Sequence, residues 1–291
     1  MTHLSINPLS HLIVYALAVV GMAVMDALAK GVSSLPIAQI LVVRGVIAIV
    51  AIVLLARGVG ASSPLRQTGH LRWQVVRGLL MTGSVGLFFL SLRSLGLAEA
   101  TAIAMVAPLM MLAAGHLVLG EPISRVQIAA CMAGFTGVLL IVRPGASLDP
   151  TGALLVLAST VFYTAMVLLT RRIGYNASAS ATALIGNAVI TVVCLVLVLS
   201  QGWEPVDAVH WGLLVAVGLT AASANVLHAQ ALRRVSVSAA ATLDYTVLVW
   251  AILLGWIFWG EVLTAWAMTG AAVITVAGIV ALHKRRPATG L

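Results

Sequence analysis

Residues 115–122 have the sequence GHLVLGEP, and 140 positions later residues 255–262 have the sequence GWIFWGEV. The same offset aligns further residues without a gap: His70 with His210, Gly78 with Gly218, and Leu92-Arg93 with Leu232-Arg233. Shared apolar composition does not explain matches of His, Arg and Glu in one register, so we infer an internal repeat. The repeat predicts two domains, residues 1–145 and 146–291.

Composition places both halves in a membrane. Hydrophobic residues make up 62% of the 291 residues and charged residues only 8%, whereas roughly a quarter of a soluble domain is charged. Apolar runs occur at about 11–30, 36–56, 73–93, 98–119, 123–142, 151–170, 178–199, 210–232, 238–259 and 263–283. Each run is long enough to cross a bilayer as a helix. The sequence predicts an all-α membrane protein with ten transmembrane helices.

The basic residues predict the orientation of these helices. With ten spans, eleven Lys and Arg residues in connections and at the C-terminus fall on one side of the membrane, and only Lys30, Arg93 and Arg143 fall on the other. Because Lys and Arg are retained in the cytoplasm, both termini are expected there. Five spans per half is an odd number, so the two repeats are expected to be inverted. We expect a multi-pass protein of a bacterial-type cytoplasmic (inner) membrane.

The sequence also excludes several classes of function. It contains no Walker-type phosphate loop, no paired-histidine metal motif and no serine in a nucleophile elbow, so no enzyme activity is expected. Cys131 and Cys194 lie in separate apolar runs and are interpreted as small core residues. No cofactor and no metal are expected. The net charge of +8 is explained by membrane topology, so no nucleic-acid partner is expected.

Inverted repeats are typical of transporters that open one midplane site alternately to either side of the membrane. Helical spacing then indicates which side chains face that site. In the first span, for example, Tyr15, Val19, Met22 and Asp26 share one face. The candidate substrate-binding residues are Met22, Ser84, Phe88, Met105, Pro108, Tyr163, Met166, Asn187, Asn225, His228 and Tyr245. This mixed lining suits an amphipathic solute.

Ionisable residues inside a span are rare and costly, so each needs a reason. The candidates for charge pairing or proton coupling are Asp26, Arg44, Arg77 and Asp244. Asp26 and Arg44 are expected at similar depth in the outer half, where an ion pair is plausible and Lys30 competes for the same carboxylate. Asp244 and His228 form a second candidate pair for proton exchange. The alternative is that Asp244 only neutralises Arg77 or Arg234.

A Gly-Glu pair after the fourth and ninth spans carries a family resemblance. Pro108, residues 119–122 (LGEP) and the small residues Gly134 and Gly137 match one copy of the pattern, and Gly260-Glu261 with Gly270 match the second. Over nearly its whole length the chain resembles the drug/metabolite transporter superfamily, specifically the EamA-type exporters. Leu248 replaces the expected proline in the second copy.

The resemblance implies secondary transport of small metabolites, commonly outward, through a cavity lined by spans one to four and six to nine. The branch that exports amino acids, including aromatic ones, is the most similar. Glu121 and Glu261 are expected to cap or hinge the following helix. Two alternatives stay open, a channel-like facilitator and a flippase for a lipid-linked anionic substrate, for which Arg44 and Arg77 are the deep basic candidates. The expected partners are a small-molecule substrate and membrane lipid. The sequence leaves the oligomeric state open, and a monomer is compatible with it.

Overall fold

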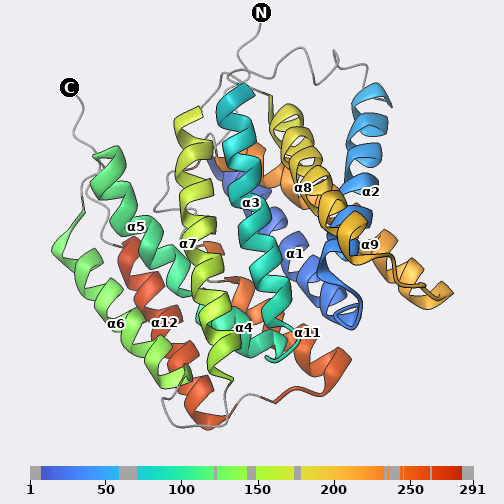
Figure 1. Ribbon diagram of the computed structural model, residues 1–291. Coiled ribbons are helices and arrows are strands. Elements are labelled where there is room, and N and C mark those ends of the chain that lie inside the picture. Colours follow the sequence, from blue (N-terminus) through green and yellow to red (C-terminus); the bar gives the residue numbers. More distant parts are fainter. Residues whose placement is uncertain are drawn as a thin grey trace, which may run out of the picture.

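The computed structural model describes residues 8–58, 71–120, 123–142, 149–173, 178–232, 235, 243–244, 246–262 and 264–283. Over these ranges the secondary structure is helical (Figure 1). The helices are α1 (Pro8–Gly31), α2 (Ile37–Gly58), α3 (Leu71–Ser91), α4 (Leu97–Ala104), α5 (Val106–Leu119), α6 (Arg125–Val142), α7 (Pro150–Ile173), α8 (Ala179–Gln201), α9 (Ala208–Leu232), α11 (Thr246–Trp259) and α12 (Ala265–His283).

Seven helical segments in the described ranges are long and apolar enough to cross a membrane, with α4 and α5 together forming one of them. Three shorter apolar helices lie at Ile128–Gly137, Thr246–Trp259 and Met268–Ala277. The surface is rich in large apolar side chains, such as Leu199 and Val192, which are 78% and 62% exposed. Buried positions include polar ones, such as Gln39 and Gln74. Apolar residues outside and polar residues inside are typical of a helical bundle in lipid.

Helix packing is symmetric when the two halves of the chain are exchanged. The contact of α1 with α9 has its counterpart in that of α3 with α7, and the contact of α2 with α9 has its counterpart in that of α3 with α8. The pairs α2–α8 and α6–α12 each join equivalent helices of the two halves, and the contact of α1 with α11 has its counterpart in that of α5 with α7. Figure 1 shows α6 and α12 side by side at one edge of the bundle, with α5 beside them.

The repeated Gly-Glu pair has a conformational reason. Gly120 ends α5 and Gly260 follows α11, and both have the positive φ of a left-handed helix cap, 67° and 62°. Their amide groups donate to the carbonyl groups of His116 and Trp256 at 3.1 and 3.0 Å. Glycine is the residue that adopts this conformation without steric cost, so the motif ends the same helix in both halves.

Two aligned glycines allow close contact between helices. A Cβ atom on Gly218 of α9 would lie 2.5 Å from the Cβ of Ile47 on α2, and one on Gly78 of α3 would lie 2.7 Å from the Cβ of Val189 on α8. Both separations are below van der Waals contact, so only glycine fits at these crossings.

We therefore expect Gly218→Ala to lower the thermal unfolding midpoint of the purified protein, because overpacking a helix contact costs about 1–3 kcal/mol. Gly212→Ala on the same helix is the matched control, since no atom lies within 4 Å of its added Cβ. Alanine favours a helix over glycine, so this control is expected to be neutral or stabilising. Equal midpoints for the two variants would contradict the close packing.

Candidate functional site

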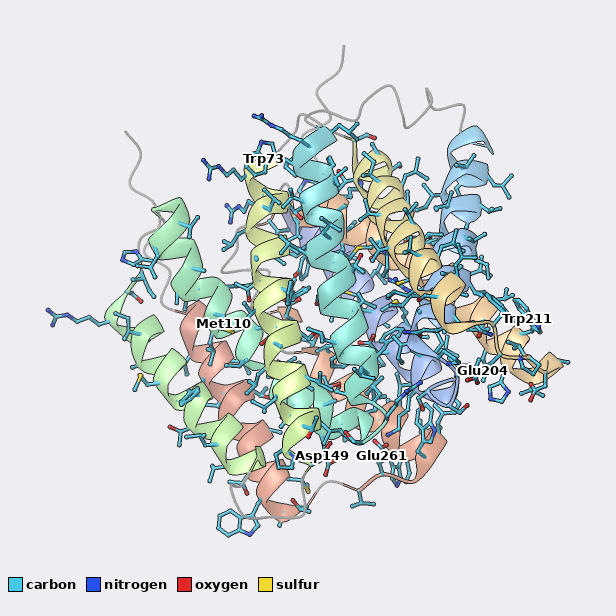
Figure 2. All side chains as sticks on the ribbon, viewed as in Figure 1. Trp73, Met110, Asp149, Glu204, Trp211 and Glu261 are labelled. Atoms are coloured by element: carbon cyan, nitrogen blue, oxygen red, sulfur yellow. The ribbon has the colours of Figure 1, made fainter. Side chains whose placement is uncertain are left out.

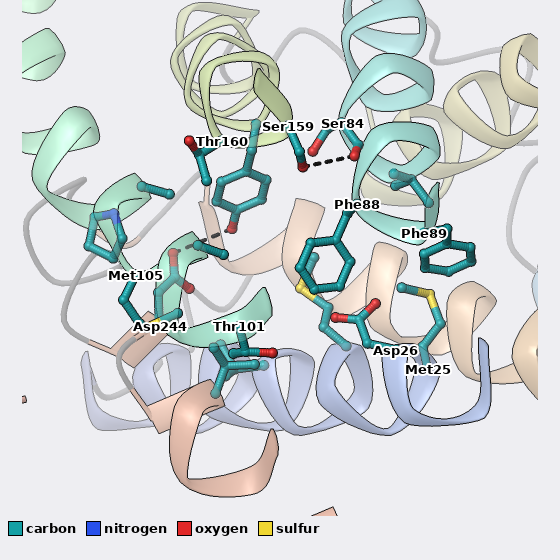
Figure 3. A pocket seen from close by; sticks show the side chains of 18 residues that line it. Met25, Asp26, Ser84, Phe88, Phe89, Thr101, Met105, Ser159, Thr160 and Asp244 are labelled. Atoms are coloured by element: carbon teal, nitrogen blue, oxygen red, sulfur yellow. Dashed lines mark hydrogen bonds between the residues drawn. The ribbon is translucent and has the colours of Figure 1, made fainter. Parts of the chain in front are cut away.

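A cavity lies between helices of both halves, with about 800 Å³ of empty space including its open mouth. Its wall is formed by residues of α1, α3, α4, α5 and α7, together with Asp244, which precedes α11, and Val247 of α11. Figure 3 shows Asp26 and Asp244 on the wall with Phe88 and Met105, and the apolar side chains outnumber the polar ones. The two carboxylates give this lining an acidic character, because it includes no Lys or Arg.

The helix break at Met105 helps to form the cavity. Helix α4 ends at Ala104 and α5 begins at Val106, with Met105 between them. Pro108 has no amide hydrogen to donate to the carbonyl of Ala104, and its ring disfavours a continuous helix at this position. Ala104, Met105 and Pro108 all line the cavity. The kink expected from Pro108 therefore lies beside the candidate site.

Asp244 lies at the centre of a buried polar cluster that joins three helices. The hydroxyl of Tyr15, from α1, donates to one carboxylate oxygen of Asp244 at 2.8 Å. The hydroxyl of Tyr163, from α7, donates to the other at 3.4 Å and lies 3.3 Å from Nε2 of His228 on α9. The imidazole of His228 lies near both phenol rings, with centroids 5.5 and 6.2 Å away. Among the described residues Asp244 is therefore bound by two tyrosines and forms no ion pair with Arg77 at 4.0 Å or less. Arg234, the other partner considered for Asp244, lies outside the described residues.

Asp26 lies on the cavity wall, and Arg44 lies behind the wall on α2. The two side chains interact electrostatically, but within the described ranges no ion pair joins them at 4.0 Å or less. Lys30, which we expected to compete for Asp26, pairs instead with Glu261. The expectation that Lys30 belongs to a cluster with Asp26 and Arg44 is therefore wrong.

Arg77 is a structural link between helices in this conformation. Its Nε donates to the hydroxyl of Thr170 on α7 at 2.7 Å, and its Nη1 donates to the carbonyl of Thr182 on α8 at 3.4 Å. Arg77 is 2% exposed and is absent from the cavity lining.

Glu261 forms a cluster at one end of the bundle, which we call the Lys30 end. Its carboxylate pairs with Lys30 at the end of α1 and accepts the amide of Ala98, near the start of α4, at 3.4 Å. The ammonium of Lys30 also lies 5.6 Å from the ring centroid of Trp259. Glu261 was expected to act on the following helix, α12; instead it joins α1, α4 and the end of α11. Figure 2 shows Glu261 and Asp149 at the same end of the bundle. Glu121 lies outside the described residues.

The cavity brings together part of the predicted site. Eight candidates are on its wall: Met22, Asp26, Ser84, Phe88, Met105, Pro108, Tyr163 and Asp244. Six lie off the wall in this conformation: Arg44, Arg77, Met166, Asn187, Asn225 and His228. Tyr245 falls outside the described residues. His228 stays next to the site through Tyr163.

Several residues of the site are not among the candidates that the sequence predicts: Phe89 and Thr101 of the wall, and Tyr15 of the adjacent cluster. The signal for Tyr15 was present, since it shares a helical face with Met22 and Asp26. No pattern singled out Thr101. Within the described ranges, no three His, Cys, Asp or Glu side chains are grouped so as to hold a metal ion.

Known proteins share both the sequence pattern and the fold. The pseudopaline exporter CntI of Pseudomonas aeruginosa is 29% identical over 259 residues, covering 88% of this chain and 90% of that protein. A riboflavin transporter of Vibrio cholerae is 26% identical over 243 residues, covering 83% of this chain and 81% of its own length. A crystal structure with 19% identity matches 94% of this chain and 96% of its own with a TM-score of 0.72, which shows a shared fold.

The family model of the EamA-like transporters matches the chain twice, over residues 9–143 and 150–282. The two matches cover almost all of the sequence, one in each half. These helices and this cavity are those of a membrane transporter and not of an enzyme, and the chain belongs to the EamA-like transporter family, within the drug/metabolite transporter superfamily.

Proposed function

We propose that the protein exports amino acids and related small amphipathic metabolites by alternating access through the cavity between its halves. The observation that carries this proposal is the cavity wall, which combines apolar side chains such as Phe88 and Met105 with the carboxylates of Asp26 and Asp244. Such a wall suits a small molecule with one apolar part and one charged part. One relative is named an exporter and another a riboflavin transporter, which supports an organic solute.

Alternating access rests on an inverted repeat of residues 1–145 and 146–291. The symmetric helix contacts and the two family matches support two equivalent halves. We infer ten spans, seven from the long helices and three from the shorter apolar ones. The start of α1 and the end of α12 both lie at the end of the bundle opposite the Lys30 end (Figure 1). This arrangement is expected if the chain crosses the membrane an even number of times. With the basic residues on the cytoplasmic side, the Lys30 end faces outward in the inner membrane.

A lipid-linked anionic substrate is less favoured. In this conformation the wall presents two carboxylates and no Lys or Arg, and like charges repel a head group that carries negative charge without a cation. A channel differs from a carrier in its kinetics and not in its lining. The deciding experiment is counterflow in proteoliposomes loaded with a mixed amino-acid and metabolite pool. Trans-accelerated, saturable exchange of a few amino acids would support a carrier and name its substrates, whereas linear flux without acceleration would contradict alternating access.

We expect cysteines at Phe88 and Met105 to react with a small hydrophilic thiol reagent, and substrate to slow that reaction. The background carries Cys131→Ser and Cys194→Ser. Leu154→Cys and Val192→Cys are matched controls, because these side chains are 66% and 62% exposed on helix faces directed away from the cavity. A thiol in hydrocarbon does not ionise readily, so the controls are expected to stay unreactive. Unreactive Phe88→Cys and Met105→Cys variants, read by mass spectrometry, would contradict a hydrated cavity.

A further inference from the structure

Two oppositely charged groups near the cavity have polar atoms without hydrogen-bond partners. Asp26 is on the cavity wall, and its carboxylate makes no hydrogen bond or ion pair with the part of the chain that the structure describes. Arg44 is 1% exposed, and its Nε and Nη1 atoms have no hydrogen-bond partner. The two charges attract each other, but a charged group with unsatisfied hydrogen-bonding atoms is costly in a protein interior, and more so in a membrane. These two groups are therefore suited to binding a ligand.

A third unsatisfied polar atom lies in the same region. Asn187 of α8 is 0% exposed, and its Oδ1 has no hydrogen-bond partner. It packs against the residue next to Arg44, since a Cβ on Gly45 would lie 3.2 Å from the carbonyl oxygen of Asn187. The region therefore contains unused donors on Arg44 and unused acceptors on Asp26 and Asn187. A matching ligand has both an anionic acceptor group and a cationic donor group.

Charge balance distinguishes among possible head groups. An amine alone would pair with Asp26 and leave the guanidinium of Arg44 unmatched, and a carboxylate alone would leave Asp26 unmatched. A zwitterion matches both charges and keeps the local net charge unchanged, which is the favourable condition in a medium of low dielectric constant.

Resting on the proposed transport function, we propose that Asp26 binds the ammonium group and Arg44 the carboxylate group of an α-amino acid. The apolar side chain of the ligand then lies along Met22 and Phe88 on the cavity wall. Arg44 is behind the wall in this conformation, and its long, flexible side chain turns its guanidinium toward the ligand on binding. The planar fork of that group matches a carboxylate through two parallel hydrogen bonds.

Three probes with one apolar part and different head groups test this assignment. They are L-phenylalanine, which is a zwitterion, 2-phenylethylamine, which is a cation, and 3-phenylpropionate, which is an anion. Binding is read as the shift of the thermal unfolding midpoint of the purified protein, and transport as competition with labelled L-phenylalanine in counterflow. For the unmodified protein we expect L-phenylalanine to bind at least about tenfold more tightly than either single-charge probe, because each one leaves a buried charge unpaired.

The two variants are expected to change this preference in opposite directions. Asp26→Asn removes the cation-binding group and shifts the preference toward 3-phenylpropionate. Arg44→Gln removes the anion-binding group and shifts it toward 2-phenylethylamine. Arg44→Lys keeps the positive charge but lacks the planar guanidinium group. Its preference among the three probes is expected to lie between that of the unmodified protein and that of Arg44→Gln. A purely structural role for either residue would weaken the three probes together and leave their order unchanged.

The outcomes separate this inference from the proposed function. If L-phenylalanine or another amino acid exchanges but the three probes bind equally, the head-group assignment is overturned and the transport function stands. If the two variants weaken all three probes in parallel, the assignment is also overturned. If no amino acid exchanges at all, the proposed function fails and the assignment fails with it.

Discussion

Replacement of Asp244 by asparagine is expected to abolish the response of transport to an imposed pH gradient. Asp244 is on the cavity wall, where a carboxylate can take up a proton from one side of the membrane and release it on the other. The groups that face it are the hydroxyls of Tyr15 on α1 and Tyr163 on α7, with His228 of α9 reached through Tyr163. No cationic side chain among the described residues pairs with Asp244, so a proton is the natural cation to compensate its charge.

The expected size of this effect follows from the proton gradient. One pH unit corresponds to about 1.4 kcal/mol per proton, or about tenfold in substrate accumulation for an exchange of one proton. We expect accumulation of that order in proteoliposomes that contain the unmodified protein. With Asp244→Asn, accumulation with and without the gradient is expected to be the same.

Tyr15→Phe and Tyr163→Phe are matched controls, because each removes one hydroxyl donor to Asp244 and leaves the carboxylate in place. They are expected to alter the pH at which coupling is half-maximal without removing it. His228→Gln tests whether the imidazole, which reaches Asp244 only through Tyr163, contributes to the coupling. A gradient response in Asp244→Asn that equals that of the unmodified protein would show that the proton binds elsewhere. Asp26, the second carboxylate on the cavity wall, is then the next candidate.

Sequence alone predicts much of the architecture, because the signals are local and strong. Apolar runs of about 20 residues predict membrane helices, and an offset of 140 residues predicts two repeats. The Gly-Glu pairs predict helix ends, and Gly120 and Gly260 have the positive φ that explains the glycine. Pro108 predicts a kink, and the structure interrupts the helix at Met105.

The partners of charged side chains were harder to predict, since they depend on helices far apart in sequence. Helical spacing suggested Asp26 as a partner of Lys30 four residues later, but Lys30 pairs with Glu261, 231 positions away. In the same way, Asp244 is bound by Tyr15, 229 positions away. Periodicity gives the face on which a residue lies, and only the packing of helices gives the residue opposite to it.

Whether an inward-facing residue reaches the cavity wall was also hard to predict from the sequence. Helical spacing predicts inward faces for Asn187 and Met166, and both are buried, but they lie off the cavity wall. An inward face of a long helix contacts neighbouring helices over most of its length and a cavity over only part of it. Thr101 lines the cavity together with Ala104 and Met105 at the break after α4, and no local pattern in the sequence distinguishes it.

Breaking the Lys30–Glu261 pair is expected to make the cavity more accessible from the Lys30 end. The pair joins the end of α1 to the connection after α11, and Glu261 also accepts the amide of Ala98 near the start of α4. The side chains of Lys30 and Glu261 are only 13% and 19% exposed, so solvent screens their attraction weakly. Three helix ends from both halves are held together by one carboxylate, which is the arrangement expected of a closed gate.

Glu261→Gln and Lys30→Met each remove one charge and leave the other partly buried without a partner. Loss of about 1–3 kcal/mol from the closed state would raise the population of the open state by roughly 5- to 150-fold, as long as the closed state still predominates. The measurement is the rate at which the Phe88→Cys thiol reacts with an impermeant reagent added on the side of the Lys30 end. Under the proposed orientation this is the outside of a right-side-out vesicle.

The exchanged pair Lys30→Glu with Glu261→Lys separates a gate from a structural defect. It restores the attraction between the two positions but not the acceptor for the amide of Ala98, so partial return of the slow reaction rate is expected. The ring of Trp259, which contacts the ammonium of Lys30 in the unmodified protein, also loses its cation in this variant. If neither single variant speeds the reaction, the pair does not control access to the cavity. If both singles speed it and the exchanged pair slows it again, the charge pair itself controls access from that side.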